Sequence, residues 1–115
     1  AATLADGVTE LVNAAREPEI GDLAMCLMRM GARIEGIGTD RLTIEGVKTL
    51  AAATHPIIPD RIEAGTFACA AAITGGTVLL EGARMADLGA VARILRDAGV
   101  DVAERHDGLQ VARLN

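Results

Sequence analysis

The sequence has almost no aromatic residues and little positive charge. Phe67 is the single aromatic side chain among 115 residues, and Trp and Tyr are absent. Lys48 is the only lysine, and the formal net charge is −5. Binding to a phosphate backbone favours a basic face, and stacking on bases requires aromatic rings. The composition therefore argues against a nucleic-acid partner.

Long apolar runs are also missing. No run approaches the roughly 20 residues of a membrane span, and no basic-then-apolar signal segment opens the chain. The two cysteines, Cys26 and Cys69, lie in helical patterns. They are predicted to be small buried core residues of a reducing compartment, with a disulfide between them as the alternative. We expect a soluble, cytoplasmic protein with no membrane partner.

What the sequence does contain is an internal repeat. Residues 2–34 align without gaps with residues 70–102 at an offset of 68, and the offset becomes 67 after one residue is lost in a turn. The identical pairs include Gly7/Gly75, Thr9/Thr77, Leu11/Leu79, Ala15/Ala83, Arg16/Arg84, Gly21/Gly89, Ala24/Ala92, Leu27/Leu95, Gly31/Gly99, Asp40/Asp107 and Leu42/Leu109. Matches that fall on glycines and turns indicate a duplicated supersecondary unit.

The first copy predicts one helix between short strands. Pro18 is suited to the first helical position, with acidic neighbours in the first turn, and Gly31 is a stop signal. The predicted elements are a helix end at Ala1–Ala5, a strand at Thr9–Ala14, a helix from Pro18, and a hairpin of Arg33–Ile37 with Arg41–Val47. The apolar stripe of the helix is predicted to comprise Ile20, Leu23, Ala24, Leu27, Met28 and Met30.

The second copy predicts the same order of strands and helices, with an additional strand and helix at its start. Asp60 followed by Glu63 is a capping-box pattern that opens a helix. The predicted elements are a connector Lys48–Thr54, a strand His55–Ile58, helices from Asp60 to about Thr74 and at Ala86–Ala98, a strand Thr77–Glu81, and a hairpin of Asp101–Glu104 with Leu109–Ala112. Each complete unit is βαβαββ, an α+β fold of tandem units with helices on one sheet face. Because the chain opens without Met in a helix-like stretch, we expect the first unit to be truncated and the chain to be a piece of a longer protein.

Several segments closely resemble the bacterial UDP-N-acetylglucosamine enolpyruvyl transferases (1-carboxyvinyltransferases) of the enolpyruvate transferase family. The resemblance covers essentially the whole chain, corresponds to a middle segment of roughly a quarter of the family enzyme, and is strongest over Asn13–Thr74. The segments that carry it are Asn13–Ile20, Met30-Gly31-Ala32, Gly38-Thr39-Asp40, Ile44–Val47 and Ile58–Thr66.

The resemblance implies a fold of six βαβαββ units in two lobes, an inside-out α/β barrel with substrates in the cleft between the lobes. It implies that the enolpyruvyl group of phosphoenolpyruvate moves to the 3-hydroxyl of UDP-N-acetylglucosamine with release of phosphate, in peptidoglycan precursor synthesis, without metal or other cofactor. The family chain crosses between lobes near Pro59–Glu63. Residues 1–58 would then belong to one lobe and residues 59–115 to the other.

Much of the family's chemistry has no counterpart in this segment. The contexts of Cys26 and Cys69 do not look like the Gly-rich loop of the family's catalytic cysteine. The family's Lys-Asn pair, its cleft arginines and its later aspartate are also absent from these residues. The partners would be the two substrates and the rest of the enzyme chain, and we expect no turnover by the isolated segment.

Two helix starts carry the candidate site residues. Both are explained structurally by capping and by favourable interaction of carboxylates with the helix dipole. The functional alternative is that they border the substrate cleft and orient Arg or Lys partners, because a carboxylate should not contact the anionic phosphoenolpyruvate. The candidates are Arg16, Glu17 and Glu19 at the first start and Asp60, Arg61 and Glu63 at the second.

The remaining polar and sulfur-containing residues suggest no site. His55 and His106 are predicted to be turn or strand-end residues, and they lack ligand-spaced neighbours for a metal. Met25, Met28 and Met30 are predicted to pack on a helix face. Two other functions stay open: a stand-alone βαβαββ module for protein interaction or dimerisation, and an enzyme acting on RNA ends, since RNA 3′-phosphate cyclases share this repeat architecture.

Overall fold

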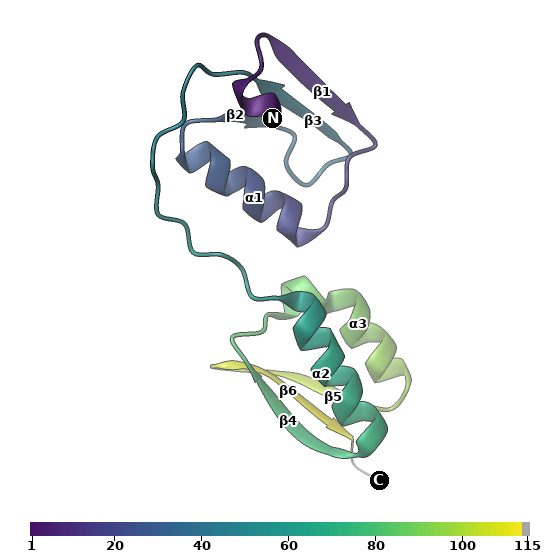
Figure 1. The fold of residues 1–115 in the computed structure, drawn as a ribbon. Helices are drawn as coiled ribbons and strands as arrows, with labels where there is room; N and C mark the ends of the chain where they lie inside the picture. Colours follow the sequence, from purple (N-terminus) through teal and green to yellow (C-terminus); the bar gives the residue numbers. More distant parts are fainter. Residues whose placement is uncertain (114–115) are drawn as a thin grey trace. The chain divides into compact units, whose positions relative to one another are not determined.

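The computed structural model describes residues 1–113, and the chain folds into two compact units, Ala1–Ile58 and Pro59–Asn115. Each unit contains one open three-stranded antiparallel sheet with helix packed against it (Figure 1). The described residues form a mixed α/β structure with no closed barrel. The assignment of the two units to two lobes of a larger enzyme stays a prediction.

The first unit places one long helix on its sheet. In chain order it contains η1 (Ala2–Leu4), β1 (Val8–Val12), α1 (Pro18–Arg29), β2 (Arg33–Glu35) and β3 (Arg41–Glu45). The strand order is β1-β3-β2. Pro18 occupies the first helical position as predicted, since its missing N–H is not needed there. The end of a helix predicted at the N-terminus is a single 3₁₀ turn.

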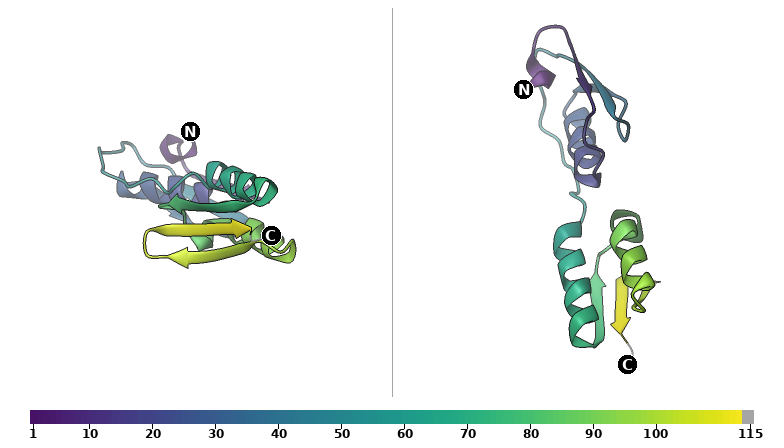
Figure 2. Two further views of the ribbon diagram at one scale, coloured as in Figure 1. Left: turned by 90° about the horizontal axis from the view of Figure 1, so that it is seen from below. Right: turned by 90° about the vertical axis from the view of Figure 1, so that its right-hand side faces the viewer.

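The second unit places two helices on one sheet. It contains α2 (Arg61–Thr74), β4 (Gly76–Glu81), α3 (Met85–Asp97), β5 (Asp101–Arg105) and β6 (Gly108–Arg113). The strand order is β4-β6-β5, so that β6 is central as β3 is in the first unit. Figure 2 shows α2 and α3 side by side, and they contact each other. The two sheets confirm the predicted duplication.

The helices before the two hairpins end in the same way. Gly31 follows α1 and Gly99 follows α3, both with positive φ (105° and 84°). In the first unit the Gly31 N–H donates to the Met28 carbonyl and the Ala32 N–H to the Leu27 carbonyl. The equivalent pair of bonds follows α3. Both ends are Schellman motifs, which glycine favours because it tolerates the left-handed region. The prediction that these glycines are equivalent is confirmed.

The structural alignment of the two units contains a one-residue gap after the first strand. Thr9 and Leu11 pair with the buried β3 residues Ile44 and Leu42. In the second unit the residues that pair with the corresponding β6 core residues are Val78 and Leu80, at an offset of 69. Asn13, at φ 58°, is the extra residue that restores the offset of 68. The alignment of Leu11 with Leu79 is therefore wrong by one residue. Directly paired residues share a sheet face, so Leu11 corresponds to Leu80.

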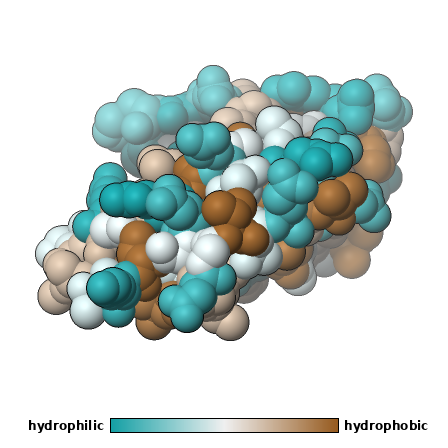
Figure 3. Space-filling model, turned by 90° about the horizontal axis from the view of Figure 1, so that it is seen from above, coloured by the Kyte–Doolittle hydropathy of each residue, from teal (hydrophilic) through white to brown (hydrophobic). Residues whose placement is uncertain are grey.

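Each unit has its own small core. The second is the larger and combines apolar residues of α3 and the sheet with alanines of α2. The first is built from the five residues Ala24, Ala32, Ile34, Leu42 and Ile44. On the face drawn in Figure 3, hydrophobic side chains lie among hydrophilic ones. None of the helices within residues 1–113 is long and apolar enough to cross a membrane.

The strand predicted at His55–Ile58 is wrong. The segment has no regular secondary structure and belongs to neither sheet. The connector is held on the first unit by the Ala51 N–H, which donates to the Met30 carbonyl at 2.8 Å. Pro56 and Pro59 have no N–H to donate to a ladder, and a strand needs a partner edge as well as a pattern.

The predicted burial of the sulfur side chains is also wrong in part. Cys69 is exposed and Cys26 is half-buried, and both are free thiols. Cys69 lies one position past the buried Ala68, a rotation of about 100° on an α-helix that carries it off the core side. Met25 and Met28 are 50% and 43% exposed. Of the stripe predicted on α1, Ala24 is buried, Ile20 and Leu27 pack against the core, and Leu23 and Met28 are exposed.

Candidate functional site

The start of α2 is organised by Asp60. Its Oδ1 accepts hydrogen bonds from the backbone N–H groups of Ile62 (2.9 Å) and Glu63 (3.0 Å), which confirms the predicted N-cap. A cap of this kind satisfies helix N–H groups that have no intrahelical partner. Among the hydrogen bonds of the described residues, Oδ2 accepts none, so one carboxylate oxygen is available to a further donor.

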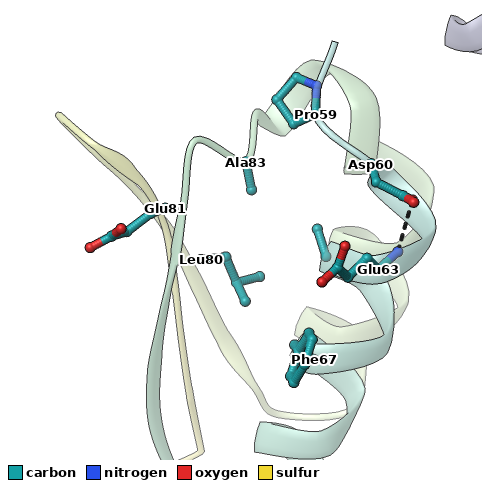
Figure 4. Close-up of a pocket in the computed structure, with 8 residues that line it drawn as sticks. Pro59, Asp60, Glu63, Phe67, Leu80, Glu81 and Ala83 are labelled. Carbon is teal, nitrogen blue, oxygen red and sulfur yellow. Dashed lines mark hydrogen bonds between the residues drawn. The ribbon is translucent and has the colours of Figure 1, made fainter. Parts of the chain in front are cut away.

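An open pocket of about 270 Å³ lies beside this cap. Figure 4 shows Glu63 and Phe67 of α2 directed towards Leu80 of β4, while the side chain of Glu81 points away from them. The pocket brings two predicted candidates together with residues that the sequence did not suggest. Its lining consists of Pro59, Asp60, Glu63, Ala64, Phe67, Leu80, Glu81 and Ala83. It combines carboxylates at its mouth with an apolar floor.

The start of α1 carries the other three candidates. Glu17 is the N-cap residue, but its side chain makes no capping hydrogen bond, and Glu19 lies in the first turn. Arg16 and Glu17 are exposed. At the corresponding helix start of the second unit, Arg84 pairs with Asp87 at 2.7 Å, and neither Glu17 nor Pro18 is present. Capping by its side chain therefore does not account for Glu17, although the helix dipole favours its charge.

The six candidates form two groups, each described within its own unit. Arg16, Glu17 and Glu19 belong to the first unit. Asp60, Arg61 and Glu63 lie within one helical turn of the second. Their assignment as site residues stays a prediction.

A buried polar pair in the first unit was missed by sequence reasoning. His55 Nε2 lies 2.9 Å from Asp22 Oδ1 on α1, and the two side chains are only 5% and 13% exposed. The prediction of His55 as a turn or strand-end residue did not anticipate this buried pair, whereas His106 lies in an exposed turn as predicted. Asp22 and His55 are 33 residues apart, so no local pattern could have linked them. The pair holds the end of the connector against α1.

The described residues contain no ready-made metal site. Within residues 1–113, no group of three or more His, Cys, Asp or Glu side chains is placed to hold an ion. The carboxylates among the candidates can instead accept hydrogen bonds and pair with cations, whereas Arg16 and Arg61 donate hydrogen bonds. The charged side chains at both helix starts can therefore position oppositely charged groups.

The whole described chain matches one family model. Residues 1–114 match the model described as EPSP synthase (3-phosphoshikimate 1-carboxyvinyltransferase). The chain belongs to this EPSP synthase family. The match spans both units, so the two sheets are parts of one family domain.

Curated relatives of the chain carry the name of one particular enzyme within the EPSP synthase family. The chain is 71% identical over 114 residues to the UDP-N-acetylglucosamine 1-carboxyvinyltransferase of Acidiphilium cryptum, covering 99% of this chain and 27% of the relative. It is 67% identical over 115 residues to the enzyme of the same name from Granulibacter bethesdensis, covering 100% and 27%. The chain thus spans about a quarter of the length of these relatives, as the resemblance predicted.

A solved structure supports the same family fold. The enolpyruvyl transferase NikO from Streptomyces tendae superposes with a TM-score of 0.71 at 25% sequence identity. The match covers 97% of this chain and 27% of the NikO chain.

Proposed function

We propose that this chain is part of a cytoplasmic UDP-N-acetylglucosamine 1-carboxyvinyltransferase, acting in peptidoglycan precursor synthesis. The observation that carries the proposal is the 71% identity to a relative of that name along 99% of the chain. The family model is named for the enzyme acting on shikimate 3-phosphate, but highly similar curated relatives carry the UDP-N-acetylglucosamine name. The proposed substrates are therefore UDP-N-acetylglucosamine and phosphoenolpyruvate.

The proposed reaction is an addition followed by an elimination. The methylene carbon of phosphoenolpyruvate gains a proton, and the sugar 3-hydroxyl loses one as its oxygen bonds to the central carbon. Loss of a methyl proton and of phosphate then restores the double bond. Such chemistry requires a positioned acid and base and cationic donors for phosphate and carboxylate.

Within this reaction we assign the residues of this chain to positioning. Oδ2 of Asp60 and the carboxylate of Glu63 lie at the mouth of the α2 pocket, where they can pair with Arg or Lys groups of the longer protein. Charge-assisted pairing fixes the geometry of such cations. The carboxylates of Glu17 and Glu19 have the same assignment at the start of α1, with Arg16 beside them, and Arg61 accompanies Asp60. Phosphoenolpyruvate itself would contact the cations.

The test is a pair of substitutions at Asp60 in the longer enzyme. Asp60→Asn keeps an N-cap acceptor of similar strength but removes the charge, whereas Asp60→Ala removes both. We expect kcat/KM to fall in both variants, by about tenfold or more if a charged positioning contact worth roughly 1.5–3 kcal/mol is lost. Thermal stability should fall only in Asp60→Ala. Wild-type kcat/KM in folded Asp60→Asn would reduce Asp60 to a helix cap.

The isolated chain provides a separate test. We expect no turnover, because the segment offers one lysine and no converging set of cationic groups. The measurement is phosphate release from phosphoenolpyruvate in the presence of UDP-N-acetylglucosamine. Sustained release above a protein-free control would show that these residues contain the catalytic groups.

A further inference from the structure

The connector that follows β3 is first attached at the C-terminal end of α1. Leu50 packs against the first core, and the Ala51 N–H donates to the Met30 carbonyl at 2.8 Å. The Thr54 carbonyl then accepts a hydrogen bond from the Arg29 side chain at 3.3 Å. The connector therefore begins its course along α1 at the last turn of that helix.

The last attachment of the connector is the buried pair of His55 and Asp22. On α1, Asp22 and Met30 lie eight residues apart, about 12 Å at 1.5 Å per residue. On the connector, the four residues from Ala51 to His55 span at most about 14 Å. The two lengths are similar, so the chain between the two attachments has little slack.

His55 is the side chain that anchors this part of the connector. Among residues 51–57 it is the one residue that is not exposed. Its Nδ1 is buried without a partner among the described residues, which an apolar anchor would have avoided. What the histidine adds is direction, because a hydrogen bond fixes a distance and an angle, whereas apolar contacts are non-directional. The pair with Asp22 thus fixes the point at which the chain leaves α1.

The link from this point to the second unit is short and stiff. It consists of the four residues Pro56–Pro59, since Asp60 already caps α2. The rings of Pro56 and Pro59 restrict φ at both ends of the link. The free length between the two units is therefore set by the position of His55.

Release of His55 would lengthen this link. The Arg29–Thr54 hydrogen bond is long and exposed to water, so it holds little by itself. The next attachment along the chain is the backbone hydrogen bond of Ala51. The free length would then be the eight residues 52–59, twice the length with the pair intact.

We propose that the Asp22–His55 pair is a clasp that confines the motion between the two units to Pro56–Pro59, and that His55 thereby acts as a positioning residue. In the chain, the pair stands between the two groups of candidates, because Asp22 follows Glu19 by three residues and His55 precedes Asp60 by five. The positioning role rests on the proposed function, whereas the confinement of motion does not.

Doubling the free length has two measurable consequences. The root-mean-square span of a flexible linker grows with the square root of its length, so the spread of distances between the units should widen about 1.4-fold. The effective concentration of one unit at the other falls with about the −3/2 power of length, roughly threefold. A substrate that needs groups of both units then meets a smaller competent fraction, so its KM rises about threefold while kcat changes little.

The first measurement is the distance distribution between the units in the longer protein, without substrate. The exposed residues Val12 and Leu79 are replaced by p-acetylphenylalanine, whose ketone carries a spin label and leaves the cysteines untouched. Double electron–electron resonance then gives the distribution, which should widen about 1.4-fold in His55→Ala. His55→Gln should keep the wild-type width, because the glutamine amide can donate to Asp22 in place of Nε2.

Ile44→Val is the matched control for stability. It trims the buried core of the first unit and leaves the clasp in place, so the distribution should keep its wild-type width. Equal widening in Ile44→Val and His55→Ala would assign the effect to lost stability and overturn the clasp. An unchanged width in His55→Ala would overturn it as well. If His55→Ala does not fold, His55→Leu takes its place, since leucine keeps an apolar anchor without the hydrogen bond.

Steady-state kinetics of the same variants, without labels, test the positioning role. We expect the KM for UDP-N-acetylglucosamine to rise about threefold in His55→Ala at nearly constant kcat, and to stay at the wild-type value in His55→Gln and Ile44→Val. A wild-type KM despite a widened distribution would overturn the positioning role. A longer wild-type protein that does not act on this substrate would refute the proposed function instead, and the distance measurement would still decide on the clasp.

Discussion

Removing the imidazole of His55 should lower the stability of the first unit and leave that of the second unit unchanged. The side chain pairs with Asp22 at 2.9 Å in a site where both partners are nearly buried. His55→Ala leaves the Asp22 carboxylate without this partner, and an unsatisfied buried acceptor costs about 1–3 kcal/mol. His55 Nδ1 is itself buried without a partner, so the substitution also removes one unsatisfied atom. The loss should therefore fall towards the lower end of that range.

Hydrogen exchange is the suitable assay, because the chain has no Trp or Tyr to report unfolding by fluorescence. Where α1 opens together with its sheet, a loss of about 1–2 kcal/mol accelerates exchange of its amides by roughly 5- to 30-fold. The amides of α2 and α3 serve as an internal reference, since they belong to the other unit. His106→Ala is the matched control, because that side chain is 94% exposed.

A double-mutant cycle with Asp22→Ala isolates the pair itself. We expect a coupling free energy of at least about 0.5 kcal/mol, the lower bound for residues in direct contact. Unchanged exchange of α1 in His55→Ala, or additive effects in the cycle, would refute the view that this pair fastens the connector to α1.

Three further substitutions or labels test the packing directly. Gly46→Ala should destabilise the first unit by about 1–3 kcal/mol or more, because its Cβ would lie 1.5 Å from the Ala5 carbonyl oxygen; circular dichroism melting would detect this, and an unchanged melt would contradict it. Gly89→Ala should stabilise α3 by about 0.5–1 kcal/mol, since the added methyl meets no neighbour, and a lowered midpoint would count against it. Maleimide should label exposed Cys69 faster than half-buried Cys26, and the reverse order would contradict the difference in exposure between the two thiols.

Helix boundaries were predictable because neighbouring residues determine them. Pro18 at a first helical position, Asp60 at an N-cap and Gly31 after a final turn each act within four residues. The hairpins followed from turn residues between alternating patterns. Elements that depend on a distant partner were not predictable in this way. His55–Ile58 has a strand-like pattern, but a strand also requires an edge to pair with.

The candidate site shows the same difference between features set by neighbouring residues and features set by distant ones. The capping role of Asp60 is local and was visible in the sequence, whereas its pocket exists only because β4 brings Leu80 against α2. The predicted burial of Cys69 is wrong because a helical pattern rich in alanine does not show which side of the helix faces the sheet. The hydrophobic contrast around α2 is weak, because alanine is abundant on both sides of that helix.

The one-residue difference in the first strand shows what identity matching leaves out. Val12 pairs with Arg41 and the Ala14 N–H donates to the Asp40 carbonyl, so Asn13 lies between two ladder contacts that are adjacent in the second unit. There, Glu81 and Gly82 make the equivalent contacts without an intervening residue. An asparagine tolerates the positive φ that accommodates the insertion. A sequence comparison scores Leu11 against Leu79 as an identity, but a slip of one residue exchanges the two faces of a strand. Only the pairing register reveals that Leu11 lies on the sheet face that carries the buried Leu42 and Ile44, and that its counterpart in the second unit is Leu80.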